Sequence, residues 1–181
     1  MATTTQITWE SFEKLPDSDG MHRELIEGEL QILPPPKSGH SIVASNAAEA
    51  LRPLREHLGG RILLEAGFQL SEDRRTWIQP DVSFVRKERV LDTPDSGYFH
   101  GGPELAVEVV SPSESATDLN RKVELLLKAG SLAVWVLYPN QREVRVFWPS
   151  GESIRKRIGD ALSLPELLPG WECPVARLFE D

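Results

Sequence analysis

An isolated carboxylate in an apolar stretch is the first sign of a chemical site. Glu108 lies within residues 104–110, which are otherwise almost wholly apolar and predict a strand buried on both faces. An ionised glutamate in such a strand needs a cation or strong hydrogen-bond donors beside it. A second acid, Asp81, follows Gln79 and Pro80 in the preceding predicted strand. The proline predicts an edge or a bulge at that point, where regular strand pairing is broken.

Two carboxylates on neighbouring strands predict a bound cation. They repel each other by roughly 4 kcal/mol at an intermediate effective dielectric, so the arrangement requires a proton or a metal ion. Carboxylate oxygens are the ligands that Mg²⁺ or Mn²⁺ prefers, and we expect Asp81 and Glu108 to lie close enough to share such an ion. The alternative is that Asp81 caps a turn while Glu108 pairs with an arginine.

A lysine on the following helix is the candidate third member of this site. Residues 117–129 predict a helix whose apolar positions cluster on one side, facing the sheet. Lys122 lies roughly 80° from the centre of that apolar side, so its long side chain can run along the apolar surface toward the carboxylates. Arg121 and Lys128 are expected to point to solvent. The alternative for Lys122 is a surface lysine that only covers apolar neighbours.

The sequence patterns that surround these residues predict one α/β domain over residues 1–181. Its mixed sheet is expected to be flanked by helices and to position the candidate residues. Two short strands on either side of Glu27 and Gly28 predict an N-terminal β-hairpin. Residues 38–58 have the apolar spacing of an amphipathic helix, which Pro53 is expected to kink or divide. The strand–helix–strand order around Glu108 predicts a parallel pair.

The remaining segments complete the predicted sheet. Residues 61–70 and 77–85 predict a second hairpin, and residues 132–137 and 143–147 predict two further strands joined by a turn. Residues 86–102 are polar and rich in glycine and proline, which predicts an irregular surface loop that could cover a site.

Four motifs, taken in order along the chain, carry a resemblance to a known family. They are RELIEGEL at residues 23–30, QPDV at 79–82, AVEVVSPS at 106–113 and DLNRK at 118–122. The chain resembles the Uma-type family of restriction endonucleases, which is part of the PD-(D/E)XK nuclease superfamily. The resemblance extends over nearly the whole chain and implies a restriction-endonuclease-like fold.

The resemblance also implies roles for particular residues. Asp81 and Glu108 would be metal ligands for Mg²⁺ or Mn²⁺, Glu24 an accessory acid of the site, and Lys122 the catalytic lysine. The superfamily usually has its lysine two residues after the acid, where this chain has Val110. The Uma-type family instead places the lysine on the next helix, and this chain resembles it with Lys122. Four residues depart from the family's common pattern: Leu126, Ala133, Val134 and Tyr138.

Two further residues are weaker candidates. Gln79 lies two positions before Asp81, on the same strand face, where it could contact substrate or a metal-bound water. His40 lies near a predicted helix start, where a capping or hydrogen-bonding role is favoured over catalysis.

Composition restricts the classes of partner. The chain has 20 Lys+Arg against 28 Asp+Glu, a net charge of −8, so strong binding of nucleic acid through the overall field is not expected. Bound cations would supply local attraction for a phosphate. No stretch is long and apolar enough for a membrane span, and the N-terminus lacks signal-peptide features, so we expect no membrane partner and a cytoplasmic protein. Leu125, on the polar side of its predicted helix, favours a homo-oligomer.

These observations together predict a Mg²⁺-dependent endonuclease that hydrolyses phosphodiester bonds of nucleic acid, with DNA as the expected substrate. The competing hypothesis is a catalytically silent binding or assembly module that has kept the nuclease fold. The acidic composition favours the second hypothesis, whereas the presence of Asp81, Glu108 and Lys122 together favours the first.

Overall fold

A central mixed sheet carries Glu108 on β9, one of its inner strands. The computed structural model describes residues 5–16, 21–94, 97–111 and 114–180. In the central sheet the strand order is β12 (Ser153–Arg157), β11 (Glu143–Phe147), β10 (Ala133–Tyr138), β9 (Leu105–Val109), β7 (Val82–Val85) and β4 (Arg61–Leu64). β9 and β10 are parallel and the other neighbours are antiparallel, which confirms the predicted mixed sheet.

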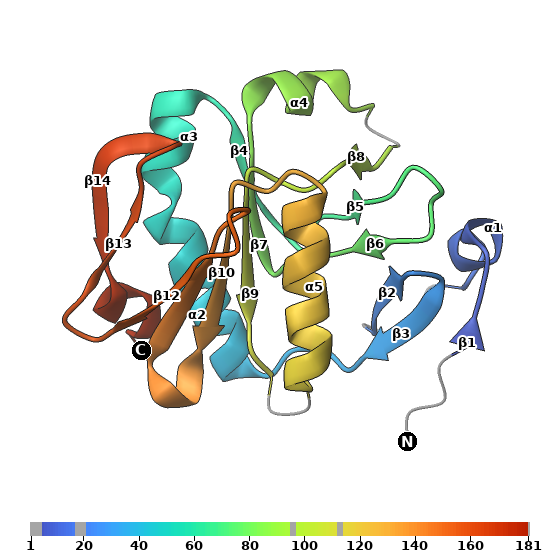
Figure 1. Ribbon diagram of the computed structural model, residues 1–181, viewed down its shortest axis with the longest axis horizontal. Coiled ribbons are helices and arrows are strands. Elements are labelled where there is room, and N and C mark those ends of the chain that lie inside the picture. Colours follow the sequence, from blue (N-terminus) through green and yellow to red (C-terminus); the bar gives the residue numbers. More distant parts are fainter. Residues whose placement is uncertain (1–4, 17–20, 95–96, 112–113, 181) are drawn as a thin grey trace.

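A second sheet lies beside the central one and contains the predicted N-terminal hairpin (Figure 1). Its order is β1 (Thr5–Gln6), β3 (Glu29–Leu33), β2 (His22–Ile26), β6 (Trp77–Ile78), β5 (Phe68–Gln69) and β8 (Phe99–His100). We call it the N-terminal sheet. The β2–β3 turn has positive φ at both Glu27 (52°) and Gly28 (86°), as a two-residue hairpin turn with the right twist requires.

The predicted second hairpin is divided between the two sheets. β5 pairs with β6 in the N-terminal sheet, whereas β4 pairs with β7 in the central sheet. One strand breaks around Gly67 and the other at residues 79–81, which include the proline that predicted a break. The expectation of two continuous strands was therefore wrong, because each strand changes sheet halfway along its length.

Helices cover both faces of the central sheet (Figure 1). α2 (Ser38–Ala50) and α3 (Arg52–Leu58) pack on one face, and the predicted division of this helix occurs at Leu51, two residues before Pro53. α5 (Ala116–Lys128) packs on the opposite face, against buried residues of β9 and β10. α1 (Trp9–Glu13) packs on the N-terminal sheet.

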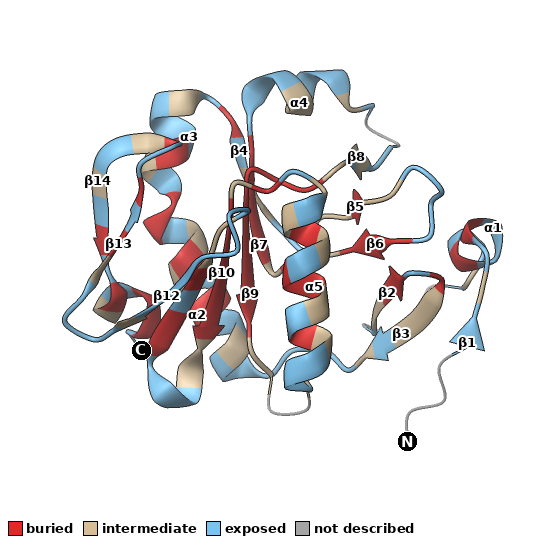
Figure 2. Ribbon diagram, viewed as in Figure 1, coloured by how far each residue is buried: buried red, intermediate tan, exposed pale blue. Residues whose placement is uncertain are grey.

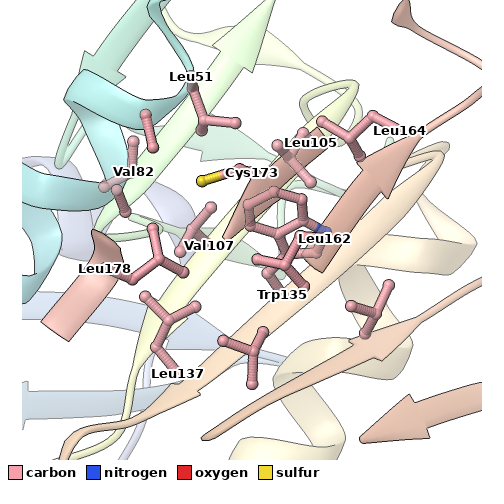
Figure 3. Packing of buried hydrophobic residues seen from close by; sticks show 14 of the residues in the cluster. Leu51, Val82, Leu105, Val107, Trp135, Leu137, Leu162, Leu164, Cys173 and Leu178 are labelled. Atoms are coloured by element: carbon pink, nitrogen blue, oxygen red, sulfur yellow. The ribbon is translucent and has the colours of Figure 1, made fainter. Parts of the chain in front are cut away.

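The largest apolar core lies on the α2 and α3 side of the central sheet (Figures 2 and 3). Trp135 of β10 is fully buried there, together with Leu105 and Val107 of β9. The C-terminal elements close this core: β13 (Ala161–Leu164), β14 (Leu168–Pro174) and the 3-10 helix η2 (Val175–Phe179). The free thiol of Cys173 is buried among them, in keeping with a structural role.

The predicted irregular loop at residues 86–102 is more ordered than expected over residues 86–94 and 97–102, and residues 95–96 lie outside the described residues. It contains a short helix, α4 (Lys87–Asp92), and β8, which pairs with β5 in parallel. The Arg89 side chain of α4 donates hydrogen bonds to the carbonyl oxygens of His100 and Gly102, which ties the two ends of the segment together. The remaining connection, the 3-10 helix η1 (Pro139–Gln141), joins β10 to β11. Within the described residues no helix is long and apolar enough to cross a membrane.

Candidate active site

Glu108 and Lys122 form a buried ion pair between the central sheet and α5. Lys122 Nζ lies 3.0 Å from Glu108 Oε2, and both residues are 4% exposed. The strand positions alternate, so Glu108 points to the same face as Ala106, which packs against α5. α5 begins at Ser115, whose hydroxyl accepts a hydrogen bond from the Asp118 amide at 3.1 Å. The reach of Lys122 predicted from helical spacing is therefore confirmed.

Glu24 reaches the same lysine from the N-terminal sheet. Its Oε1 lies 3.2 Å from Lys122 Nζ and accepts a hydrogen bond from the Gln79 amide at 3.2 Å. Glu24 is 1% exposed. One ammonium group therefore joins two carboxylates that belong to different sheets.

Arg121, next to Lys122, holds the N-terminal hairpin against α5. It donates from Nε to Glu27 at 2.7 Å and from Nη1 to Glu29 at 3.0 Å. The expectation that Arg121 points freely to solvent was wrong, because the hairpin of the other sheet packs against that side of the helix. Lys128, at the end of α5, is exposed as predicted.

Asp81 lies at the break between β6 and β7 and is held by two donors. Its Oδ2 accepts a hydrogen bond from the Val109 amide at 2.6 Å and lies 3.3 Å from His40 Nε2 of α2. Val82 is opposite Val107, so continuing the antiparallel register by one residue sets Asp81 opposite Glu108. The Asp81 and His40 side chains are 19% and 17% exposed, so the solvent-facing side of the cluster is formed here.

Gln79 contributes its backbone to the site. Its amide holds Glu24, while its side chain donates from Nε2 to the Glu65 carbonyl oxygen at 2.9 Å. That bond fixes the chain where it passes from one sheet to the other. Contact of Gln79 with substrate remains a prediction.

We call Glu24, Asp81, Glu108 and Lys122 the cluster, and in it the carboxylates outnumber the cations. Burial raises the pKa of Glu108 well above its ordinary value, and the nearby Asp81, Glu24 and Glu114 act in the same direction against the opposing effect of Lys122. Burial opposes the charged form of Lys122, but Glu108, Glu24 and Glu114 outweigh it and raise the lysine's pKa well above its ordinary value. The neighbouring carboxylates add to both shifts, since a surplus of negative charge favours bound protons or a bound cation.

The donor set fits a divalent cation held by few protein ligands. Glu24 Oε2 and Glu108 Oε1 are buried and have no hydrogen-bond partner, which leaves two oxygens available. In the described part of the chain no three His, Cys, Asp or Glu side chains converge tightly enough to hold an ion by themselves. Mg²⁺ is commonly held by one or two carboxylates with water and phosphate oxygens completing the shell, so the residues suit that ion.

Two residues close to the cluster were not among the principal sequence candidates. His40 was expected to have a hydrogen-bonding role, and the structure places it on Asp81, which raises the pKa of the imidazole against the effect of burial. Glu114 precedes α5, and burial raises its pKa, with Glu24 and Asp81 adding to the effect. Glu114 could have been found from the sequence, because it is the next acid after the strand that carries Glu108. Residues 112–113 of the third motif lie outside the described residues.

The fold is α/β and restriction-endonuclease-like, with a mixed sheet flanked by helices. Residues 9–176 match the Uma2 family, described as "Putative restriction endonuclease", and the chain belongs to that family. The structure is similar to the crystal structure of a "putative nuclease belonging to DUF820" from Anabaena variabilis ATCC 29413, with a TM-score of 0.81 and 23% sequence identity over 96% of this chain and 97% of the other. A search of curated proteins gave no match.

Proposed function

We propose that this protein is a Mg²⁺- or Mn²⁺-dependent endonuclease that hydrolyses phosphodiester bonds of nucleic acid, with DNA as the first substrate to test. The observation that carries the proposal is the buried cluster in which Lys122 contacts Glu24 and Glu108 while one oxygen of each carboxylate has no partner. Ionisable groups whose pKa values are shifted by burial and by specific charged partners cluster at functional sites. Membership in a family described as restriction endonucleases supports the same reaction class.

Asp81 and Glu108 would hold the cation, Glu108 through its unpaired Oε1, and Glu24, whose Oε2 is also unpaired, would be the accessory acid. When bound, the ion supplies Lewis-acid activation of a phosphodiester oxygen and of an attacking water. His40 keeps Asp81 in place through Nε2, and the Val109 amide holds the same oxygen. Because Asp81 and His40 form the solvent-facing side of the cluster, a phosphate group would approach from there.

Lys122 would act as a fixed donor at the reacting phosphate. Glu24 and Glu108 hold its ammonium group in place and raise its pKa, so it stays protonated throughout the neutral range. A protonated amine stabilises negative charge that develops on phosphoryl oxygens, and a preorganised donor of this kind contributes a large part of such rate enhancements. Lys122 therefore supports the transition state without having to give up its proton.

Thermal unfolding with and without divalent ions tests the cation site. A ligand that binds only the folded state raises the melting temperature, so Mg²⁺ or Mn²⁺ should stabilise the wild type. Asp81→Ala and Glu108→Ala should lose that response. Equal metal-induced shifts in all three proteins would refute this site.

Cleavage of supercoiled DNA in the presence of Mn²⁺ tests the activity. Lys122→Ala should lose activity on the order of 10²-fold or more. Lys128→Ala is the matched control, because Lys128 is an exposed lysine of the same helix, whereas Arg121 holds the hairpin and would disturb Glu24. Equal losses in both variants would remove Lys122 from the mechanism.

The alternative function is a catalytically silent binding or assembly module. It is favoured by the ammonium group that already lies between the two buried carboxylates, and by the net charge of −8. A wild type that neither responds to Mn²⁺ nor cleaves any phosphodiester would establish this alternative. Sedimentation of the purified protein would test the proposed homo-oligomer.

A further inference from the structure

Three arginines at one edge of the central sheet form a concentrated positive surface on an acidic protein. Arg145 of β11 and Arg155 and Arg157 of β12 surround one carboxylate, Glu143, at 3.9, 4.0 and 3.7 Å. Glu143 is largely buried, whereas the arginine side chains are 48%, 51% and 62% exposed. We call this the arginine cluster. One carboxylate orients the three guanidinium groups but neutralises only one of them.

Strand register relates the arginine cluster to the candidate active site. Glu108 lies opposite Val136, Val136 opposite Arg145, and Arg145 opposite Arg155, in one straight row across four strands. Directly paired residues point to the same face of a sheet, so the arginines share the face of Glu108. Three strand spacings of roughly 4.8 Å put Arg155 about 14 Å from Glu108.

The next row leads across the end of the sheet. Tyr138 lies opposite Glu143, and Glu143 opposite Arg157, two residues closer to the end at which β9 and β10 finish. The guanidinium of Arg145 lies 5.4 Å from the centre of the Tyr138 ring, which helps to fix its position. Val136 packs in the apolar cluster beneath α5, so a bound strand would pass over the end of the sheet, from the active site across Tyr138 to β12.

We propose that the arginine cluster binds the phosphate backbone of the nucleic acid whose phosphodiester bond is cleaved at Glu108 and Lys122. This proposal rests on the proposed nuclease function and names the surface that holds the substrate beyond the reacting bond. The paired N–H groups of an arginine guanidinium can donate two hydrogen bonds to phosphate oxygens. Contacts of this kind position a nucleic acid without reading its sequence. Phosphates follow one another every 3.4 Å of helix axis along one strand, so a distance of about 14 Å reaches roughly four nucleotides from the reacting phosphate.

The arginine cluster also accounts for how an acidic chain would hold a polyanion. The net charge of −8 disfavours binding through the overall field. A local surplus of positive charge, in the same strand register row as the active site, would attract the phosphate backbone despite the unfavourable overall charge. Binding should therefore be weak at high salt and confined to this face.

Fluorescence anisotropy with a labelled 20-base-pair DNA, measured without metal at several salt concentrations, tests the proposal. Each lost phosphate contact lowers the salt slope of log K by about 0.9, so Arg155→Ala/Arg157→Ala should lower it by roughly 2 and weaken binding at least tenfold at low salt. Arg52→Ala/Arg55→Ala removes two exposed arginines from α3 on the opposite face and should leave the slope unchanged. Arg155→Lys/Arg157→Lys keeps both charges and should keep most of the slope.

Equal slopes in the two alanine variants would overturn the proposal, and so would loss of the slope in the lysine variant, since the effect would then not be one of charge. Hydrolysis of bis(p-nitrophenyl) phosphate with Mn²⁺ separates this result from the proposed activity. This small diester does not extend to β12, so Arg155→Ala/Arg157→Ala should hydrolyse it at the wild-type rate. A wild type that hydrolyses neither DNA nor the small ester would refute the nuclease function, while the anisotropy comparison would still decide the role of the arginines.

Discussion

Replacing Lys122 by methionine tests whether the buried cluster is held together by one positive charge. Methionine keeps most of the aliphatic volume but removes the ammonium group that lies 3.0 Å from Glu108 and 3.2 Å from Glu24. Removing one partner of a buried ion pair costs about 3–5 kcal/mol, because the remaining charge stays buried without compensation. For a chain of this size, 1 kcal/mol corresponds to roughly 2–4 °C, so we expect a melting temperature lower by roughly 6–20 °C.

The assay is thermal unfolding followed by circular dichroism, in a chelating buffer at pH 7.5. Lys128→Met is the matched control and should change the free energy of unfolding by no more than about 0.5 kcal/mol, as exposed substitutions usually do. The double variant Lys122→Met/Glu108→Gln should recover part of the loss, because it also removes one uncompensated carboxylate. A Lys122→Met protein that melts within about 2 °C of the wild type, near the lower bound for 1 kcal/mol, would refute the reasoning.

The pH dependence of the same variants gives an independent check. The raised pKa of Glu108 means that its contribution to stability is fully present below its ordinary pKa and is lost as pH rises through the folded-state value. The deficit of Lys122→Met should therefore be smaller at pH 5 than at pH 8. The pKa of Lys122 is also raised, so the wild type should keep the lysine's contribution below its ordinary pKa and lose it at more alkaline pH.

Three further predictions concern the elements that position the cluster. Arg121→Ala should speed amide exchange in the β2–β3 hairpin and lower cleavage through Glu24, while the melting temperature falls by only a few degrees, since partly exposed pairs contribute about 0.2–1 kcal/mol each; unchanged exchange would contradict it. Gly67→Ala would set its new Cβ 2.3 Å from the Trp77 ring, and urea unfolding should show a loss of about 1–3 kcal/mol. Ser115→Ala removes the cap of α5 and should lose about 0.5–2 kcal/mol in the same measurement.

Local signals in the sequence were sufficient to find Asp81, Glu108 and Lys122, whereas Glu24 was implied only by the family resemblance. Glu108 stands out as the acid inside an apolar strand, and Pro80 marks the break beside Asp81. Lys122 follows from helical spacing, because α5 has one clearly apolar side that packs on the sheet. These signals depend only on neighbouring residues, which is why they could be read without a structure.

Contacts between distant segments were not accessible in the same way. Arg121 looks like a solvent-exposed arginine until the hairpin of the other sheet packs against it. The division of residues 61–85 between two sheets also depends on which partners are available to each half-strand. Pairing partners far apart in sequence leave no periodic signal. Neither the contact of Arg121 with the hairpin nor the change of sheet could therefore be predicted.

The change of sheet has a consequence for how the protein is made. Glu24 is held by a backbone amide 55 residues further along the chain, and its lysine partner lies on a helix that follows later still. Chains emerge from the ribosome N-terminus first. A nascent chain therefore cannot form the complete cluster until α5 has been synthesised and has docked. If the cluster cuts nucleic acid, a copy that ends before α5 is harmless to the cell that produces it, because it lacks Lys122 and cannot cleave.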